Sequence, residues 1–123
     1  MIDLMKKNKS VKVVNDQIGS PTYTNDLAMV IIKIIKNYKT ESGLFHYSNE
    51  GEISWFEFAK SIKELYNLDC EIIGVSSKEF KTIAKRPKYS LLNKSKIKKT
   101  FNLEIPNYKQ SLEDCIKVIK NEA

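Results

Sequence analysis

The residue with the clearest capacity for ligand chemistry is Arg86, which precedes a proline in the stretch AKRPKYS. It is the only arginine among 123 residues that hold 21 lysines and arginines together. A guanidinium group binds phosphate through a planar fork of N–H donors, whereas lysine offers a point charge. Proline also keeps the preceding residue out of a helix. We interpret Arg86 as a candidate phosphate or diphosphate ligand; the alternative is an Arg-Pro pair that occurs by chance.

His46 is the only histidine and lies in the strand-like stretch LFHYS. No second histidine and no cysteine stands at the spacing of a zinc site. Nothing like a nucleophile elbow accompanies it, which argues against a Ser–His–Asp hydrolase. The pattern favours a structural histidine, and a hydrogen-bond donor facing a ligand is the alternative.

Two further signals of chemistry are negative. Cys70 and Cys115 are far apart and lie among apolar residues, which favours buried free thiols over a disulfide or a metal site. The four glycines fit neither G-x-G-x-x-G nor a P-loop. We therefore expect neither a metal site nor a glycine-rich phosphate loop in this chain.

The polar candidates nearest one another lie in VNDQIGSPTYTNDLA, residues 14–28. The β-branched run at 11–14 predicts a buried strand that ends at a turn. Apolar residues at helical spacing predict a well-buried helix over 25–38, capped by Thr24 or Asn25. The junction between them holds the polar stretch.

The remaining patterns complete a mixed α/β fold (α+β) in one domain, residues 1–123. Ser54 and Glu57 form a capping box that begins a helix, whose aromatic stripe indicates core packing rather than a stacking platform. Too few strands are expected for a complete dinucleotide-binding sheet. The other expected elements are strands at 44–48 and 70–75, an extended stretch at 89–93, a one-turn helix at 76–80, and helices at 95–101 and 111–121.

Charge and hydropathy narrow the class of protein. The net charge is +6, but a single arginine and scattered lysines disfavour nucleic-acid binding. No apolar run approaches the about 20 residues that span a bilayer, so we expect no membrane partner. The first ten residues lack the apolar region of a secretory signal. A cytoplasmic location is the expectation.

In sum, the chain resembles the C-terminal, substrate-binding half of dTDP-4-dehydrorhamnose reductases, members of the extended short-chain dehydrogenase/reductase superfamily. The matching stretches follow the family's order and cover nearly the whole chain. They are VVNDQIGSPTYTNDLA, GLFHYSNEGEISWFEFAKSI, VSSKEFKTIAKRPKYSLLNKSKI and SLEDCIK.

The resemblance implies a function and a set of substrate-binding residues. The family reduces dTDP-4-dehydro-L-rhamnose to dTDP-L-rhamnose with NADPH or NADH. The resemblance implies that Arg86 binds the diphosphate of the nucleotide sugar and that His46 lies at the edge of the substrate cleft. Some relatives carry an arginine that reaches phosphate near the position of Gly19, where this chain has small residues. We therefore expect one phosphate contact to be missing. The implied cleft residues of the polar stretch are Gln17, Ser20, Pro21 and Thr22.

The resemblance also implies what these residues lack. The family's base is the tyrosine of a Tyr-x-x-x-Lys pair, and none of the six tyrosines has lysine four positions on. We therefore expect NADPH or NADH to be bound by a missing N-terminal half, and this chain to be inactive alone. The alternative is a non-catalytic binding or regulatory relative. An incomplete sheet would also leave the strand at 11–14 with an open edge, so homo-oligomerisation is a further expectation.

Overall fold

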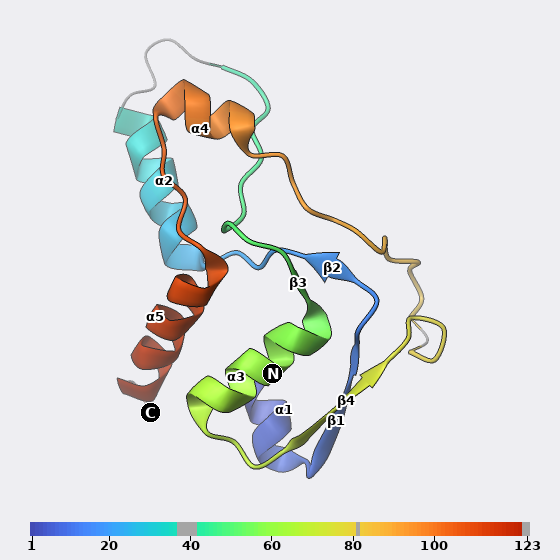
Figure 1. The fold of residues 1–123 in the computed structure, drawn as a ribbon. Helices are drawn as coiled ribbons and strands as arrows, with labels where there is room; N and C mark the ends of the chain where they lie inside the picture. Colours follow the sequence, from blue (N-terminus) through green and yellow to red (C-terminus); the bar gives the residue numbers. More distant parts are fainter. Residues whose placement is uncertain (37–41, 81, 122–123) are drawn as a thin grey trace.

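The computed structural model describes residues 1–36, 42–80 and 82–121 (Figure 1). Helices and strands alternate irregularly, which confirms the mixed α/β class. In chain order the elements are α1 (Ile2–Lys7), β1 (Ser10–Val14), β2 (Ile18–Gly19), α2 (Thr24–Lys36), β3 (Ile53–Ser54), α3 (Trp55–Tyr66), β4 (Glu71–Val75), α4 (Ser95–Phe101) and α5 (Tyr108–Asn121).

β1 and β4 form a parallel pair, although about 60 residues separate them in the chain. The register runs from Ser10 opposite Glu71 to Val14 opposite Val75. Both strands therefore end at the same edge, where Asn15 N–H donates to the carbonyl of Val75 at 3.0 Å. This edge is where ligands bind in open α/β sheets.

The first hydrophobic core lies between this pair and α3, and α1 and α5 extend it. Val11 and Val13 of β1 are buried with Ala59 and Ile62 of α3. The cap of α3 has the predicted partner: Ser54 Oγ accepts a hydrogen bond from Glu57 N–H at 3.1 Å. α3 is thus fixed at its start. Ala59 and Ile62 of its stripe are buried, whereas Trp55 and Leu65 are each 36% exposed, so the expected core role holds for only part of the stripe.

A second core joins α2 to α4 and the chain after it. Val30 of α2 is buried with Ile97 and Phe101 of α4. The rings of Phe45 and Phe101 meet edge to face, with centroids 5.1 Å apart. This core holds the end of the molecule opposite the β1–β4 pair (Figure 1).

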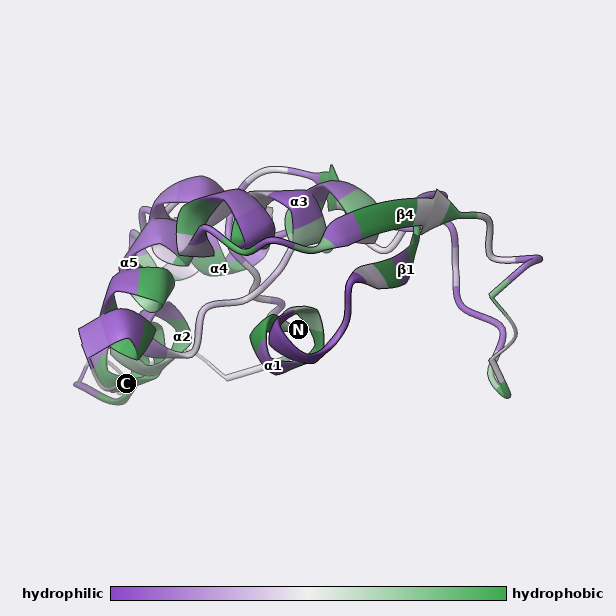
Figure 2. Cartoon of the chain, turned by 90° about the horizontal axis from the view of Figure 1, so that it is seen from below, coloured by the Kyte–Doolittle hydropathy of each residue, from purple (hydrophilic) through white to green (hydrophobic). Residues whose placement is uncertain are grey.

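β2 connects the two regions and also fixes the chain that carries Arg86. It pairs antiparallel with β3 on one side. On its other side, Ile18 N–H donates to the carbonyl of Lys88 at 2.8 Å, and Ser90 N–H donates to the carbonyl of Ile18 at 2.9 Å. The stretch between β4 and Lys88 projects away from the helices (Figures 1 and 2).

Several expected elements differ from the structure. Residues 44–48 form no strand, because no other strand of the described chain lies beside them. Residues 76–80 form a turn rather than a one-turn helix, and α5 begins three residues earlier than expected. α1 is an addition that the sequence patterns did not predict.

The expectation that the helix at 25–38 is well buried is wrong. The observed helix, α2, begins at Thr24, so neither proposed cap residue precedes it, and residues 37 and 38 lie outside the described chain. Only Val30 is buried, while Met29 and Ile35 are 67% and 64% exposed. The second core covers one stripe of α2 and leaves its other apolar residues open. No helix in the described ranges has the length and apolar character needed to cross a bilayer.

Candidate functional site

A cleft of about 770 Å³ opens at the shared edge where β1 and β4 end. One side comes from the residues that directly follow the two strands, and the other from the stretch that carries Arg86. The cleft therefore brings Gln17 and Arg86, both candidates from the sequence, to one site. Its lining residues are Asp16, Gln17, Ser76, Ser77, Lys78, Thr82, Ile83, Ala84, Lys85, Arg86 and Lys88.

A hydrogen-bonded trio links the two strand ends inside this cleft. Asp16 Oδ1 accepts from Ser77 N–H at 3.0 Å and from Ser77 Oγ–H at 2.6 Å. Gln17 Nε2 in turn donates to Ser77 Oγ at 2.9 Å. The hydroxyl bond from Ser77 is the largest cause that lowers the pKa of Asp16 below 3.8. The side chain of Gln17 is thus held by its nitrogen Nε2, and its oxygen Oε1 can accept a hydrogen bond from a ligand.

Arg86 is exposed and is placed by the chain that follows it. The bonds from Ile18 and Ser90 anchor residues 88–90 along β2, two residues beyond Arg86. Lys78, Lys85 and Lys88 line the same cleft, and Asp16 is the carboxylate among its lining residues. Four cations against one carboxylate favour an anionic ligand, and a diphosphate suits the guanidinium fork.

A side-chain turn shapes the chain just after β4. Glu79 Oε1 accepts from Ser76 Oγ–H at 2.6 Å and from Ser76 N–H at 3.2 Å. The hydroxyl bond is the largest cause that lowers the pKa of Glu79. These bonds close a turn at residues 76–80, where the sequence patterns predicted a one-turn helix.

The other sequence candidates lie elsewhere. Pro21 and Thr22 line a small pocket of about 80 Å³ against α3 and α5. Ser20 Oγ donates to the carbonyl of Asn49 at 2.5 Å, so its hydroxyl is engaged within the protein. His46 is exposed and lines neither the cleft nor this pocket. The geometry thus unites Gln17 with Arg86 and separates both from His46.

Two further residues with structural importance, Ser77 inside the cleft and Asn49 outside it, were not candidates from the sequence. Ser77 is the second residue after a predicted strand, and that position was the available signal, because parallel strands end at a shared edge. Asn49 is 1% exposed and bonds to three of the residues from Ser20 to Tyr23. Nothing local in the sequence marks it.

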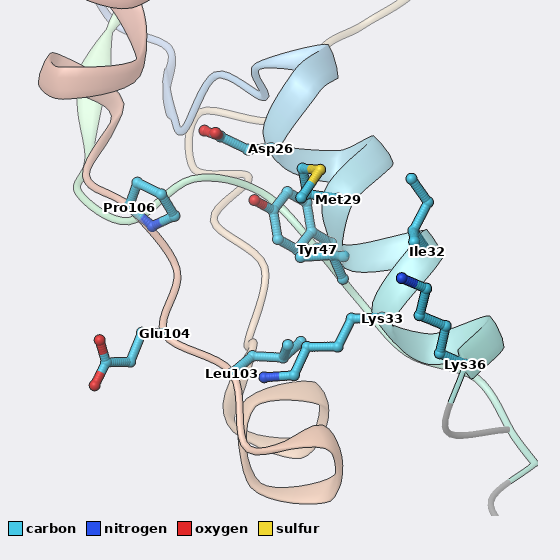
Figure 3. A pocket seen from close by; sticks show the side chains of 10 residues that line it. Asp26, Met29, Ile32, Lys33, Lys36, Tyr47, Leu103, Glu104 and Pro106 are labelled. Carbon is cyan, nitrogen blue, oxygen red and sulfur yellow. The ribbon is translucent and has the colours of Figure 1, made fainter.

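A second concavity, of about 430 Å³, lies between α2 and residues 103–106. Figure 3 shows Met29 and Ile32 on α2 and Leu103 on the segment that follows α4, with Lys33 of α2 extending toward Leu103. Tyr47 lines it, and its hydroxyl is buried without a hydrogen-bond partner. Burial, with Asp26 and Glu50 nearby, raises the pKa of Tyr47 to about 12. The tyrosine is therefore neutral near neutral pH.

Neither cysteine is in a disulfide: Cys70 is buried and Cys115 is half-buried. The described ranges contain no cluster of histidine, cysteine and acidic residues suited to a metal ion.

The fold and cleft define a class: a small mixed α/β unit whose cationic cleft lies at the carboxyl ends of two parallel strands. Comparison with known proteins makes this specific. The chain belongs to the family described as "RmlD substrate binding domain", which matches residues 1–121.

Its relatives confirm the resemblance to dTDP-4-dehydrorhamnose reductases. The chain is 34% identical over 123 residues to the enzyme of that name from Sinorhizobium fredii, covering 90% of this chain and 40% of the relative. It is 42% identical over 93 residues to the spore coat polysaccharide biosynthesis protein SpsK of Bacillus subtilis, covering 76% and 32%.

Solved structures agree with these relatives. The crystal structure of dTDP-4-dehydrorhamnose reductase from Bacillus anthracis in complex with NADP matches with a TM-score of 0.85 at 41% identity, covering 92% of this chain and 40% of that one. The ortholog from Clostridium acetobutylicum matches with a TM-score of 0.88 at 36% identity, covering 97% and 42%. The chain thus spans less than half the length of these proteins.

Proposed function

We propose that these residues form the nucleotide-sugar-binding portion of a dTDP-4-dehydrorhamnose reductase. The complete reaction would reduce dTDP-4-dehydro-L-rhamnose to dTDP-L-rhamnose with NADPH or NADH. Support comes from the family match over residues 1–121 and from relatives named for this activity. In this proposal the chain supplies the binding of the dTDP-sugar.

The observation that carries the proposal is the presence of Arg86 and Gln17 in one cationic cleft. Arg86 would bind the diphosphate through its fork, and the surrounding lysines would add charge attraction that weakens with salt. The side-chain oxygen Oε1 of Gln17 would accept a hydrogen bond from the ligand. Ser20, Pro21, Thr22 and His46 remain predictions from the resemblance.

The residues present do not fit the nicotinamide cofactor. The sequence has no glycine-rich loop to receive a pyrophosphate and no Tyr-x-x-x-Lys pair to donate a proton. We therefore propose that residues outside these 123 hold NADPH and the proton donor. Purified chain mixed with NADPH and dTDP-4-dehydro-L-rhamnose should consume no NADPH above background.

Calorimetric titration with dTDP tests the binding proposal directly. The chain should bind dTDP at millimolar concentration or below, and Arg86→Ala should weaken binding by about tenfold or more, the loss expected for a charged hydrogen-bonding partner. Lys60→Ala on α3 is the matched control, because it removes an exposed charge away from the cleft. Equal affinities for the two variants would contradict the role of Arg86.

We also infer that the chain self-associates. Among the described residues β1 pairs only with β4, which leaves its other edge open, and α2 exposes Met29 and Ile35. Open edges and apolar surface favour association. Light scattering at micromolar concentration should show a mass above the 14.2 kDa monomer. A monomeric mass would contradict this.

A further inference from the structure

Among the residues that the structure describes, Asn49 is the most completely buried polar one, at 1% exposure. Three of its hydrogen bonds go to one short stretch. Ser20 Oγ donates to the Asn49 carbonyl at 2.5 Å, Asn49 N–H donates to the carbonyl of Pro21 at 3.2 Å, and Tyr23 N–H donates to Asn49 Oδ1 at 2.7 Å. One residue therefore holds most of the chain from Ser20 to Tyr23.

The opposite side of Asn49 is anchored independently of that stretch. Its Nδ2 group donates to Asp26 Oδ2 at 2.6 Å and to Ser111 Oγ at 2.8 Å. Ser111 Oγ also donates to Asp26 Oδ2 at 2.6 Å, which closes a triangle between α2 and α5. Lys94, itself 6% exposed, donates to the Asn49 carbonyl at 2.9 Å. Asn49 thus lies in a rigid frame of several elements.

Residues 20–23 have no helix or strand of their own. A stretch of irregular backbone is ordered only when outside contacts offset the conformational entropy that it loses. Here those contacts come from the two backbone groups and the side-chain oxygen of Asn49. The position of Ser20, Pro21 and Thr22 therefore depends on Asn49.

We propose that Asn49 is a positioning residue for nucleotide-sugar binding, which holds Ser20 to Thr22 where the ligand meets them. This rests on the proposed function and on the prediction from the resemblance that this stretch contacts the dTDP-sugar, since Pro21 and Thr22 themselves line a separate pocket of about 80 Å³. Asn49 itself is too deeply buried to touch the ligand. Its replacement should weaken ligand binding by more than the accompanying loss of stability explains.

The geometry allows a rescue that a merely structural role would not predict. In the double variant Asn49→Asp with Asp26→Asn, the donor and acceptor of the 2.6 Å bond exchange places. The new carboxylate keeps an oxygen for Tyr23 N–H and accepts from Ser111, while the new amide donates to it. The single variant Asn49→Asp instead sets two carboxylates face to face. Ile62→Val in the α3 core is the control for general destabilisation.

Two measurements decide the proposal: amide hydrogen exchange at Tyr23 by NMR, and calorimetry with dTDP-L-rhamnose. Asn49→Ala should speed exchange at Tyr23 beyond the global change and weaken binding by about tenfold or more. The double variant should restore binding to within about threefold, and Ile62→Val should stay within about twofold.

The outcomes separate this proposal from the proposed function. The positioning role of Asn49 is overturned if amide exchange at Tyr23 in Asn49→Ala is no faster than in Ile62→Val. It is also overturned if Asn49→Ala leaves the affinity for dTDP-L-rhamnose unchanged, or if the double variant does not restore the slow exchange at Tyr23. If the unmodified chain does not bind dTDP-L-rhamnose while the exchange effect and its rescue hold, the proposed function fails and the positioning of residues 20–23 by Asn49 is supported.

Discussion

Asp16 and Ser77, 61 positions apart in the chain, are joined by two hydrogen bonds to a single carboxylate oxygen, of 2.6 and 3.0 Å. The bonds cross the shared end of β1 and β4, so they tie together the two strand ends that form the cleft. They also place Ser77 Oγ to accept from Gln17. The orientation of the Gln17 side chain, a proposed ligand contact, thus depends on the Asp16 carboxylate and the Ser77 hydroxyl.

Replacement of Ser77 by alanine should raise the pKa of Asp16 toward 3.8, because the hydroxyl bond is the largest cause of its lowering. NMR titration of the Asp16 carboxyl measures this. The lowered pKa stabilises the fold above about pH 3.8, and that stabilisation disappears as pH falls through the lower folded value. The difference in the free energy of unfolding between wild type and Ser77→Ala should therefore become smaller as pH falls below about 3.8. An unchanged pKa would contradict the account.

Lys94 and Lys98 both pair with Glu50, at 3.2 and 2.8 Å, but their side chains are 5% and 43% exposed. Lys94→Met should cost about 1–3 kcal/mol of unfolding free energy, because it removes a buried donor to Asn49. Lys98→Met should cost about 1 kcal/mol or less, since exposed pairs contribute little. Urea denaturation of the two variants gives the comparison. Equal losses would show that burial is not the deciding factor.

Lys98 should instead control the ionisation of Glu50. Its hydrogen bond is the largest cause that lowers the pKa of this carboxyl. In Lys98→Met the pKa of Glu50 should rise, and carboxyl titration by NMR would detect the change. A pKa that stays low in this variant would mean that Lys94 alone sets it.

Ser54 begins α3 and accepts from Glu57 N–H. Ser54→Ala should cost about 0.5–2 kcal/mol, because the amide loses its cap, whereas Ser54→Asp should retain most of the stability. Thermal or urea unfolding of the three proteins tests this. A loss for the aspartate variant as large as for alanine would show that the cap bond is not what matters at this position.

Ile62 and Ile83 compare one residue type in two environments, since Ile62 is 7% exposed and Ile83 is fully exposed in the cleft stretch. Ile62→Ala should cost about 2–5 kcal/mol through lost packing and a cavity against β1. Ile83→Ala should change stability by about 0.5 kcal/mol or less. Similar denaturation midpoints for both variants would contradict the assignment of the core.

Local patterns predicted the elements whose signals are local. The β-branched run at 11–14 and the cap at Ser54 predicted β1 and α3, because residue type and capping are properties of adjacent residues. Residues 44–48 carry the same kind of pattern, yet a strand needs a neighbour that a local pattern does not provide. α2 shows the related limit: periodicity identifies an apolar face but not what covers it.

The candidate site divides in the same way. Arg86 was a candidate because of composition and the proline after it, whereas Gln17 was a candidate only through the family resemblance. Their meeting depends on the parallel pairing of β1 with β4 and on the bridge from Ile18 to residues 88–90. Ser77 had one local signal, its position just after a predicted strand. Asn49 depends wholly on contacts across the fold, so no local pattern could have identified it.

The central claim is that the cleft at the end of β1 and β4 binds a nucleoside diphosphate. Calorimetric titration of the unmodified chain with dTDP and with thymidine, which lacks the diphosphate, tests it most directly. The account predicts that dTDP binds about tenfold or more tightly than thymidine and that added salt weakens its binding. Equal affinity for both ligands, or no binding of dTDP at millimolar concentration, would contradict it.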